Sequence, residues 1–340
     1  MILALINVVI NAFMRNVQEG IAVISTNRTL TRRHSFRSYF RKNYDMYLLL
    51  IPGLLYAIVF KLLPLLGISI AFVDYNMFAG SNPIQAILKS DFVGWKNFIR
   101  VFRKADFLQA LRNTFIISFM KIGCVFPLPI LFALIIHSVA AMRFKKVVQT
   151  IIYLPHFFSW VVVSGIFMSI LSSTGIVNTV LKGIGLIDEP ILFFMDQKIF
   201  RWLLVFTDAW KEVGWSTIVY LAALTGVDQE LYEAAVIDGA RKFQQLVYIT
   251  LPSILSTIIL MLVLRVGSIM DAGFGQILVM YNPTVYKVSD IIQTYVYRIG
   301  LGKMDFSLGT AVGLFNSVVA LVLVLGTNMI SRRLTGKSVW

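Results

Sequence analysis

The sequence has few charged residues, one cysteine and few histidines. Only 14% of its 340 residues are charged; the cysteine is Cys124, and His34, His137 and His156 lie far apart. A single thiol excludes a disulfide framework and a thiolate metal site. The scattered histidines form no ligand cluster, so we expect them to be structural. We predict no metal site, no cofactor bound by this chain and no catalytic residue.

Acidic residues are also scarce, with 17 Asp and Glu against 31 Lys and Arg, which gives a net charge of +14. The basic residues lie beside apolar stretches, as the positive-inside rule describes for membrane proteins. We therefore predict that the chain contacts a lipid bilayer and has no nucleic-acid partner.

An ATPase motif is missing as well. The nearest approach to the P-loop pattern Gly-x-x-x-x-Gly-Lys-Ser/Thr is Gly336-Lys337-Ser338, but Ser331 stands where the first glycine should be. The segment also follows a membrane helix rather than a strand. We predict that this chain is not an enzyme and that ATP hydrolysis comes from partner subunits.

What the sequence does have is long apolar runs, because 58% of its residues are hydrophobic. A membrane helix needs about 20 such residues, and only helices and closed barrels satisfy the backbone in lipid. We predict an all-α, polytopic membrane protein with about six transmembrane helices, at residues 47–73, 113–139, 148–171, 200–224, 249–270 and 306–330.

Basic residues beside the spans give the predicted topology. Before the first span stand Arg28, Arg32, Arg33, Arg37, Arg41 and Lys42, and after the last span stand Arg332, Arg333 and Lys337. They place both termini in the cytoplasm. We expect a basic tail over residues 1–44, as a tail or an interfacial helix, a membrane domain over 45–333 and a C-terminal tail over 334–340. The predicted outer loop 75–110 fits the positive-inside rule least well, because it carries the basic residues Lys96, Arg100, Arg103 and Lys104.

Several polar and aromatic residues stand inside or beside the predicted spans. A charge at membrane depth costs about 3 kcal/mol on insertion scales, so it usually faces a bundle interior or a wet cavity. Carboxylates, amines and aromatic rings together suit a polyhydroxylated ligand. The candidate pathway residues are Trp160, Asp208, Trp210, Lys211, Glu212, Trp215, Tyr220, Arg265, Asp271 and Phe274.

The alternative is that these charges pair with each other and fix the packing of the helices. Asp208 and Lys211 are spaced i, i+3 and could form such a pair. Lys121 stands alone in its apolar span. This isolation favours a structural or snorkelling position over a pathway role.

Residues 228–252 form the longest well-patterned polar segment. Leu231, Ala234 and Ala235 repeat at i, i+3, i+4, which predicts a helix with a small-residue apolar face. Asp228 is a candidate N-cap, and Gly239 can end the helix in a left-handed conformation. A second short helix is expected to follow the glycine turn and to run until Pro252.

The spacing of this segment resembles the EAA loop of ABC-importer permeases: Glu233-Ala234-Ala235, three residues, Gly239, nine residues, then Ile249-Thr250-Leu251-Pro252. In that family the loop is a cytoplasmic coupling helix that docks on an ATPase subunit. The resemblance assigns coupling roles to Glu233, Ala234, Ala235, Asp238, Gly239, Arg241, Leu251 and Pro252. The alternative is an ordinary surface helix-turn-helix between two spans.

Other stretches resemble the carbohydrate branch of type I importers, which includes polysaccharide and lipo-oligosaccharide permeases. They are residues 154–160, 291–301, 313–317 and 331–333 within a resemblance that covers about 45–333. The resemblance implies a type I permease fold in the bacterial cytoplasmic membrane. It also implies a second, commonly different permease, two cytoplasmic ATPases that bind ATP and Mg, and an extracellular solute-binding protein.

The sequence therefore favours a permease subunit of an ATP-driven importer for oligosaccharides or polysaccharide fragments. Two alternatives stay open. The same architecture could import a monosaccharide or glycerol phosphate, since basic residues do not exclude a phosphorylated solute. A stand-alone carrier would need its own ion site, for which the scattered acids and histidines offer no cluster.

Overall fold

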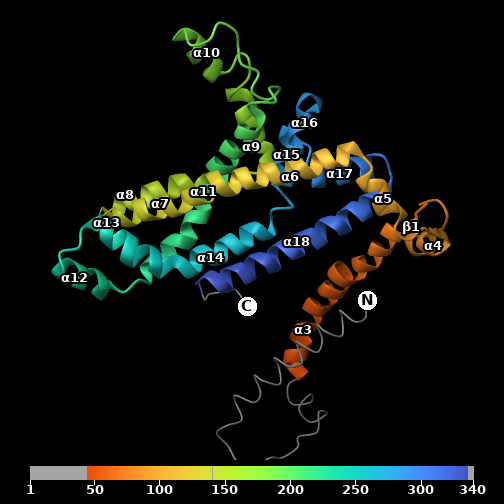
Figure 1. Cartoon of the computed structure of the whole chain (residues 1–340), viewed down its shortest axis with the longest axis horizontal. Coiled ribbons are helices and arrows are strands. Elements are labelled where there is room, and N and C mark those ends of the chain that lie inside the picture. Colours follow the sequence, from red (N-terminus) through yellow and green to blue (C-terminus); the bar gives the residue numbers. More distant parts are fainter. Residues whose placement is uncertain (1–43, 140, 336–340) are drawn as a thin grey trace, which may run out of the picture. The chain divides into compact units, whose positions relative to one another are not determined.

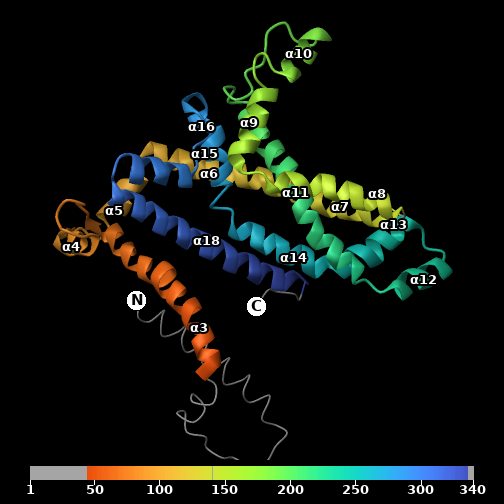
Figure 2. The same ribbon diagram turned by 180° about the vertical axis from the view of Figure 1, so that it is seen from behind.

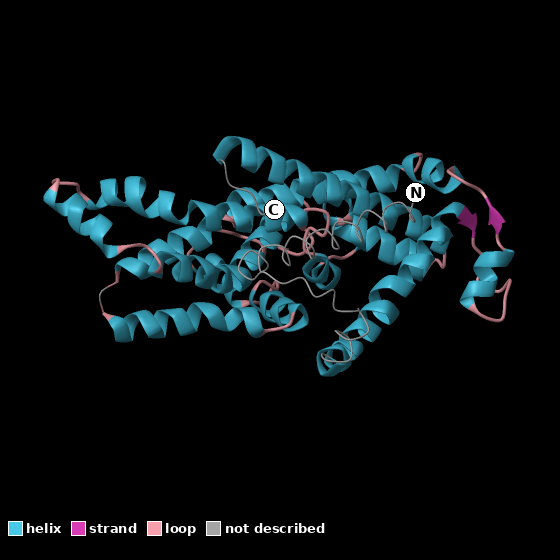
Figure 3. Ribbon diagram, turned by 90° about the horizontal axis from the view of Figure 1, so that it is seen from below, coloured by secondary structure: helices cyan, strands magenta, loops and turns pink. Residues whose placement is uncertain are grey.

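The computed structural model describes residues 44–139 and 141–335, and almost all of its elements are helices (Figure 3). The chain divides into two compact units, residues 1–65 and 66–340, and each is described by itself. The basic block before the first predicted span and Lys337 lie outside the described residues, so the tails stay predictions.

The first unit contributes a long apolar run. Helix α3 spans Tyr44–Ala57, a π turn η2 spans Ile58–Leu62, and the 3-10 segment η3, Leu63–Phe72, leads into the second unit. The run Tyr44–Phe72 has 29 residues and is long and apolar enough to cross a membrane. None of the α3 side chains is buried, which suits a helix that faces lipid. The predicted first span is confirmed over the described residues, which begin at Tyr44.

A short connecting region opens the second unit. Strands β1, Val73–Asp74, and β2, Asp91–Phe92, pair antiparallel around helix α4, Pro83–Lys89, and helix α5, Lys96–Phe102, follows. The predicted outer loop 75–110 thus contains two short helices, α4 and α5. The Asn97 side chain donates to the backbone oxygens of Ala71 and Val73 and so ties α5 to this region.

The helices of the first half of the membrane domain follow. They are α6, Ala105–Cys124; α7, Pro127–Ser138; α8, Met142–Tyr153; the 3-10 turn η4, Leu154–Phe157; α9, Trp160–Ile170; α10, Ile176–Gly183; and α11, Phe200–Thr225. The apolar segment that joins α6 and α7, Ala105–Ser138, has 34 residues. The second span is thus confirmed, but it begins at Ala105 rather than at residue 113.

The second half contains one long helix, several short ones and a final long helix. They are α12, Gln229–Ile237; α13, Lys242–Gln245; π turn η5, Leu246–Thr250; α14, Leu251–Gly267; α15, Phe274–Met280; η6, Pro283–Val285; α16, Tyr286–Ser289; α17, Ile292–Val296; π turn η7, Tyr297–Gly302; and α18, Phe306–Thr335. The fifth and sixth spans correspond to Lys242–Gly267 and Phe306–Arg333.

The third span differs from the straight helix predicted over residues 148–171. The segments Met142–Phe157 and Trp160–Ile170 are bent by 103°. Phe158 and Ser159 have extended backbone, and the Ser159 hydroxyl accepts the N–H of Val162 at 3.3 Å as an N-cap. A serine in this conformation starts a new helix, so the apolar run is broken although its composition is continuous.

Helix α11 lies at the centre of the second unit. It contacts α6, α7, α8 and α14, and α14 in turn lies beside α18 (Figures 1 and 2). Within the described residues four helices, or five if the bent pair counts as one span, pass as apolar membrane spans. With 26 residues α11 is about 39 Å long. It is long enough to cross a membrane, but with its polar centre it is not among these apolar spans, so the fourth span at residues 200–224 stays a prediction.

Gly214 marks the close crossing of α11 and α8. A Cβ atom at this position would stand 1.7 Å from the backbone oxygen of Ile152. Since the obstacle is backbone rather than a movable side chain, only glycine permits this approach.

We expect Gly214→Ala to separate α8 from α11 and to destabilise the protein by about 1–3 kcal/mol, the usual cost of overpacking. Gly165→Ala is the matched control, because a Cβ there meets no atom within 4 Å. It should be neutral or stabilising by roughly 0.5–1 kcal/mol. Thermal unfolding of the detergent-solubilised variants measures the effects of both substitutions. Equal unfolding midpoints for Gly214→Ala and Gly165→Ala would contradict the close crossing.

Candidate functional site

Helix α12 has the start and the end that the sequence predicts. The Asp228 side chain accepts the N–H of Glu230 at 3.0 Å. Gly239 has a φ of +80°. Its N–H donates to the oxygen of Val236 at 3.0 Å, while that of Ala240 reaches Ala235 at 2.8 Å. These two bonds form a Schellman motif, so both the N-cap and the glycine turn are confirmed.

The surface of α12 is open along its whole length, because none of its residues is buried. Its apolar side chains Leu231, Val236 and Ile237 are 49%, 63% and 86% exposed. Exposed apolar side chains on an unburied helix suit an interaction surface. The coupling residues predicted around it are exposed as well, apart from the half-buried Ala235: Glu233, Ala234, Asp238, Gly239 and Arg241.

The second helix of the segment does not end at Pro252, and that prediction was wrong. Lys242–Gly267 is one continuous helical run of 26 residues. A π turn over Leu246–Thr250 precedes the proline, and the N–H of Leu251 donates to the oxygen of Leu246. Proline has no N–H for the helical ladder, and the wider turn accommodates that loss. Leu251 and Pro252 therefore lie inside the helix.

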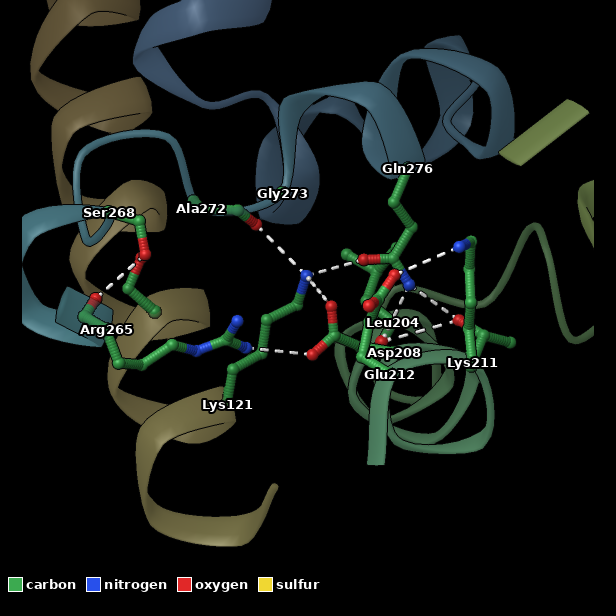
Figure 4. A network of polar contacts seen from close by, with 12 residues as sticks. Lys121, Leu204, Asp208, Lys211, Glu212, Arg265, Ser268, Ala272, Gly273 and Gln276 are labelled. Atoms are coloured by element: carbon green, nitrogen blue, oxygen red, sulfur yellow. Dashed lines mark hydrogen bonds and ion pairs between the residues drawn. The ribbon is translucent and has the colours of Figure 1, made fainter. Parts of the chain in front are cut away.

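Asp208 of α11 is the centre of a buried ionic cluster (Figure 4). Its carboxylate pairs with Lys121 of α6 at 3.1 Å and with Arg265 of α14 at 2.9 Å. Asp208 and Lys121 are 4% and 3% exposed. One carboxylate thus joins three helices that are distant in sequence.

Lys121 uses all three of its ammonium donors. Besides Asp208 they reach the backbone oxygen of Ala272 at 3.1 Å and the side chain of Gln276 at 2.5 Å. The snorkelling alternative for Lys121 was therefore wrong, and the structural one holds. The adjacent Gly273 has a φ of +85°, a backbone conformation that favours glycine. A lone lysine in an apolar span was the sequence signal for this cluster, but it did not show which residues the lysine would contact.

Arg265 differs from Lys121 because it is partly open. Its side chain is 34% exposed, and with Ser268 it lines two adjacent cavities of about 170 and 230 Å³. The first cavity also contacts Asp271, and the second contacts Glu212 and Tyr220. Small-molecule pockets typically enclose about 300–1,000 Å³, so each cavity is small for a saccharide chain.

A second polar cluster surrounds His156 at the bend before α9. Glu212 lies 2.8 Å from the His156 ring nitrogen and 3.1 Å from the Lys211 ammonium, which donates to the His156 backbone oxygen at 2.7 Å. The pair that the i, i+3 spacing of Asp208 and Lys211 would allow is thus absent, because Lys211 reaches toward η4. The histidine, treated as an isolated structural residue, is a member that the sequence analysis missed.

Aromatic rings complete this His156 cluster. The Trp215 ring stacks on the imidazole with centroids 4.5 Å apart. The Lys211 ammonium lies 5.4 Å from the centre of the Trp160 ring, within cation–π range. Trp160, Lys211 and Trp215 therefore hold the bend against α11.

The other two predicted pathway residues lie elsewhere. Trp210 packs edge-on against Phe167 at 5.4 Å, and Phe274 lies 6.3 Å from the ring of Tyr297. Neither contacts the two cavities at Arg265. The ten predicted residues thus fall into five around the cavities, three around His156 and two apart from both.

A third cluster, centred on Asp290, was not predicted. Asp290 pairs with Arg298 and accepts the Thr294 hydroxyl at 2.7 Å. Burial raises the pKa of the Asp290 carboxyl, although Thr294 and Arg298 oppose that shift. The spacing of four residues from Asp290 to Thr294 to Arg298 was a signal that could have placed them on one helical face.

Comparison with known families and proteins gives consistent matches. Residues 106–336 match the family described as "Binding-protein-dependent transport system inner membrane component". The chain is similar to Protein LplB of Bacillus subtilis, with 43% identity over 88% of this chain and 92% of the relative. It is 42% identical to the polygalacturonan/rhamnogalacturonan transport system permease protein YteP of the same organism, over 85% of this chain and 88% of YteP.

A solved structure also matches over nearly the whole chain. It is a chain of a bacterial alginate ABC transporter in complex with an alginate pentasaccharide-bound periplasmic protein. The TM-score is 0.81 with 38% identity, and the match covers 90% of this chain and 100% of that one. The likeness confirms the all-α permease fold of a type I importer that the sequence predicts.

We expect Asp208→Asn to destabilise the protein by about 3–5 kcal/mol, the usual cost of leaving a buried ionic partner unpaired. In the double variant Lys121→Met with Asp208→Asn the buried ammonium of Lys121 is gone and only the partly exposed Arg265 lacks its partner, so part of the loss should be recovered. Thermal unfolding in detergent of the single and double variants forms a double-mutant cycle. Strictly additive losses would contradict the pairing of Asp208 with Lys121.

Proposed function

Because the chain belongs to the family of binding-protein-dependent transport system inner membrane components, we propose that it imports oligosaccharides or polysaccharide fragments as one permease subunit of an ATP-driven transporter. The observation that carries the coupling part of this proposal is that α12 has no buried residue, carries exposed apolar side chains and ends at a left-handed Gly239. Such a helix suits docking in a cleft on a separate ATPase subunit, which supplies the hydrolysis that this chain has no motif for.

The substrate class rests on the relatives and on the chemistry of the cavities. YteP is named for polygalacturonan and rhamnogalacturonan, and the matching structure is an alginate transporter. In this chain the cavities at Arg265 combine hydroxyl groups, carboxylates and a partly open guanidinium. Such groups suit the hydroxyls and acidic groups of a saccharide. Asp208, Glu212, Tyr220, Arg265 and Asp271 are the pathway residues that this geometry favours.

The small size of these cavities supports a shared pathway. We infer that a second permease, commonly a different one in this family, faces the Arg265 side of α14 and completes the channel. The cavity walls then come from two chains, and the saccharide passes between them. Trp160, Trp210, Trp215 and Phe274 are less favoured as pathway residues, since they line neither cavity.

The remaining partners follow from the same proposal. The basic flanks support a cytoplasmic position for both termini and for α12 in the bacterial cytoplasmic membrane. Two ATPase subunits that bind ATP and Mg dock there, and an extracellular solute-binding protein delivers the saccharide from the other side. The matching structure, in which a periplasmic protein is in complex with its transporter, supports this arrangement.

The helical run Lys242–Gly267, which follows α12, provides a continuous connection from the ATPase side to the membrane domain. If α12 moves with the ATPase, the helical run Lys242–Gly267 moves with it, and Arg265 lies near the far end of that run. Its ion pair with Asp208 joins α14 to α11. Alternating access then requires that the inward-facing and outward-facing states bind ATP with different affinity.

We expect Gly239→Val to reduce saccharide uptake at least about tenfold, because a β-branched residue at positive φ is a strong outlier that displaces α12. Membrane insertion should be unchanged. Uptake of labelled oligosaccharide by cells, normalised to membrane-inserted protein, measures the effect. Gly183→Ala is the control, since this glycine has ordinary φ and no atom lies within 4 Å of its Cβ position.

Copurification tests the partner independently. Tagged wild-type chain solubilised in mild detergent should bring an ATPase and a second permease with it, and Glu233→Lys should release the ATPase while keeping the permease. A chain that purifies alone and transports alone would identify a stand-alone carrier. Binding of neutral, acidic and phosphorylated ligands to the solute-binding protein separates the oligosaccharide from a monosaccharide or glycerol phosphate.

A further inference from the structure

Helix α12 needs a defined position if it is to transmit force, yet its own packing supplies little. None of its side chains is buried, and it is connected to α11 and α13 by short turns. In the described part of the chain its Asp228 cap and Schellman turn are both local to the helix. These bonds fix where α12 begins and ends, and they leave its direction relative to α14 unspecified.

One side-chain hydrogen bond joins α12 to the helix that follows it. The hydroxyl of Tyr232 lies 2.9 Å from the hydroxyl of Thr250, and Thr250 is 6% exposed. Thr250 also donates toward the backbone oxygen of Gln245 at 3.3 Å. Tyr232 and Thr250 are 18 residues apart, so this contact closes the whole loop between the two helices.

A second contact fixes the connecting turn. The side-chain amide of Gln245 donates to the backbone oxygen of Ala240 at 3.1 Å. Ala240 directly follows Gly239, so the left-handed turn is held against the start of the long helix. The two contacts act on the two sides of the turn and together orient α12.

The contact of Tyr232 is made at an unusual place in the helix. Thr250 is the last residue of the π turn η5, and Pro252 follows it. π turns are rare, and many lie at functional sites. Because Pro252 has no N–H, the helical ladder also lacks one hydrogen bond beside this π turn.

We propose that the hydrogen bond between Tyr232 and Thr250 positions the coupling helix and transmits its movement to α14. This inference rests on the proposed function. Tyr232 acts through Thr250 and touches neither the saccharide nor the nucleotide, so it is a positioning residue. From Thr250 the helix continues over 15 residues, about 22 Å, to Arg265 and its ion pair with Asp208.

The test compares variants that remove one hydroxyl each in the complete transporter, reconstituted in proteoliposomes with its ATPases and binding protein. Tyr232→Phe keeps the ring, and Thr250→Val keeps the volume, but each lacks the hydrogen bond. Thr250→Ser retains a hydroxyl and serves as the conservative rescue. Thr327→Val is the matched control, because among the described residues the Thr327 hydroxyl bonds only its own helix, at Leu323.

We expect Tyr232→Phe and Thr250→Val to raise the number of ATP molecules hydrolysed per saccharide imported by about 3- to 10-fold, the equilibrium change that loss of one hydrogen bond produces. The double variant should match either single variant, because both remove the same contact. Thr250→Ser and Thr327→Val should keep the wild-type ratio. A purely structural role would lower the unfolding midpoint and reduce hydrolysis and import together, at an unchanged ratio.

Hydrogen exchange separates this inference from the function on which it rests. Amides of residues 229–237 should exchange several-fold faster in Tyr232→Phe, with or without the ATPase. If Tyr232→Phe changes neither the amide exchange of α12 nor the number of ATP molecules hydrolysed per saccharide, the positioning role is overturned. The proposed function is unaffected by that result as long as the wild-type complex imports saccharide. A wild-type complex without saccharide-dependent hydrolysis would overturn the proposed function, and the transmitting role with it.

Discussion

The membrane domain depends on one buried carboxylate that is shared by two cations. Asp208 joins α6 through Lys121 and α14 through Arg265, and Lys121 extends the cluster to the turn before α15. A buried charge is tolerated only where partners replace its hydration. The three helices must therefore meet at this depth, and the packing of the polar α11 between apolar neighbours follows from that requirement.

Much of the fold could be predicted from the sequence because apolar length and basic flanks are local properties. The spans, the Asp228 cap and the Gly239 turn required only the residues around them. The bend at Phe158 and Ser159 was missed, since it depends on local backbone geometry within a run whose composition stays apolar. The course of the helix through Pro252 was missed because a π turn absorbs the effect of the proline.

The sequence could predict which polar residues belong to the candidate site, but it could not predict which of them pair with one another. Polar residues at membrane depth identified α11 and α14, but spacing along one helix suggested that Lys211 would pair with Asp208. In the structure Asp208 pairs with Lys121 and Arg265 of other helices, while Lys211 pairs with its neighbour Glu212 and reaches the His156 carbonyl. The partners on other helices lie at distances in sequence that spacing along one helix does not encode. His156 shows the same limit, because its neighbours Glu212 and Trp215 come from α11.

The bend of the third span has a consequence for the backbone inside lipid. A helix that stops at membrane depth presents carbonyl groups that no water reaches, and each one left alone is costly. The ammonium of Lys211 meets the His156 carbonyl at this place, 2.7 Å away. A side chain of α11 thus replaces an amide that the interrupted helix no longer offers, and it stabilises the bend.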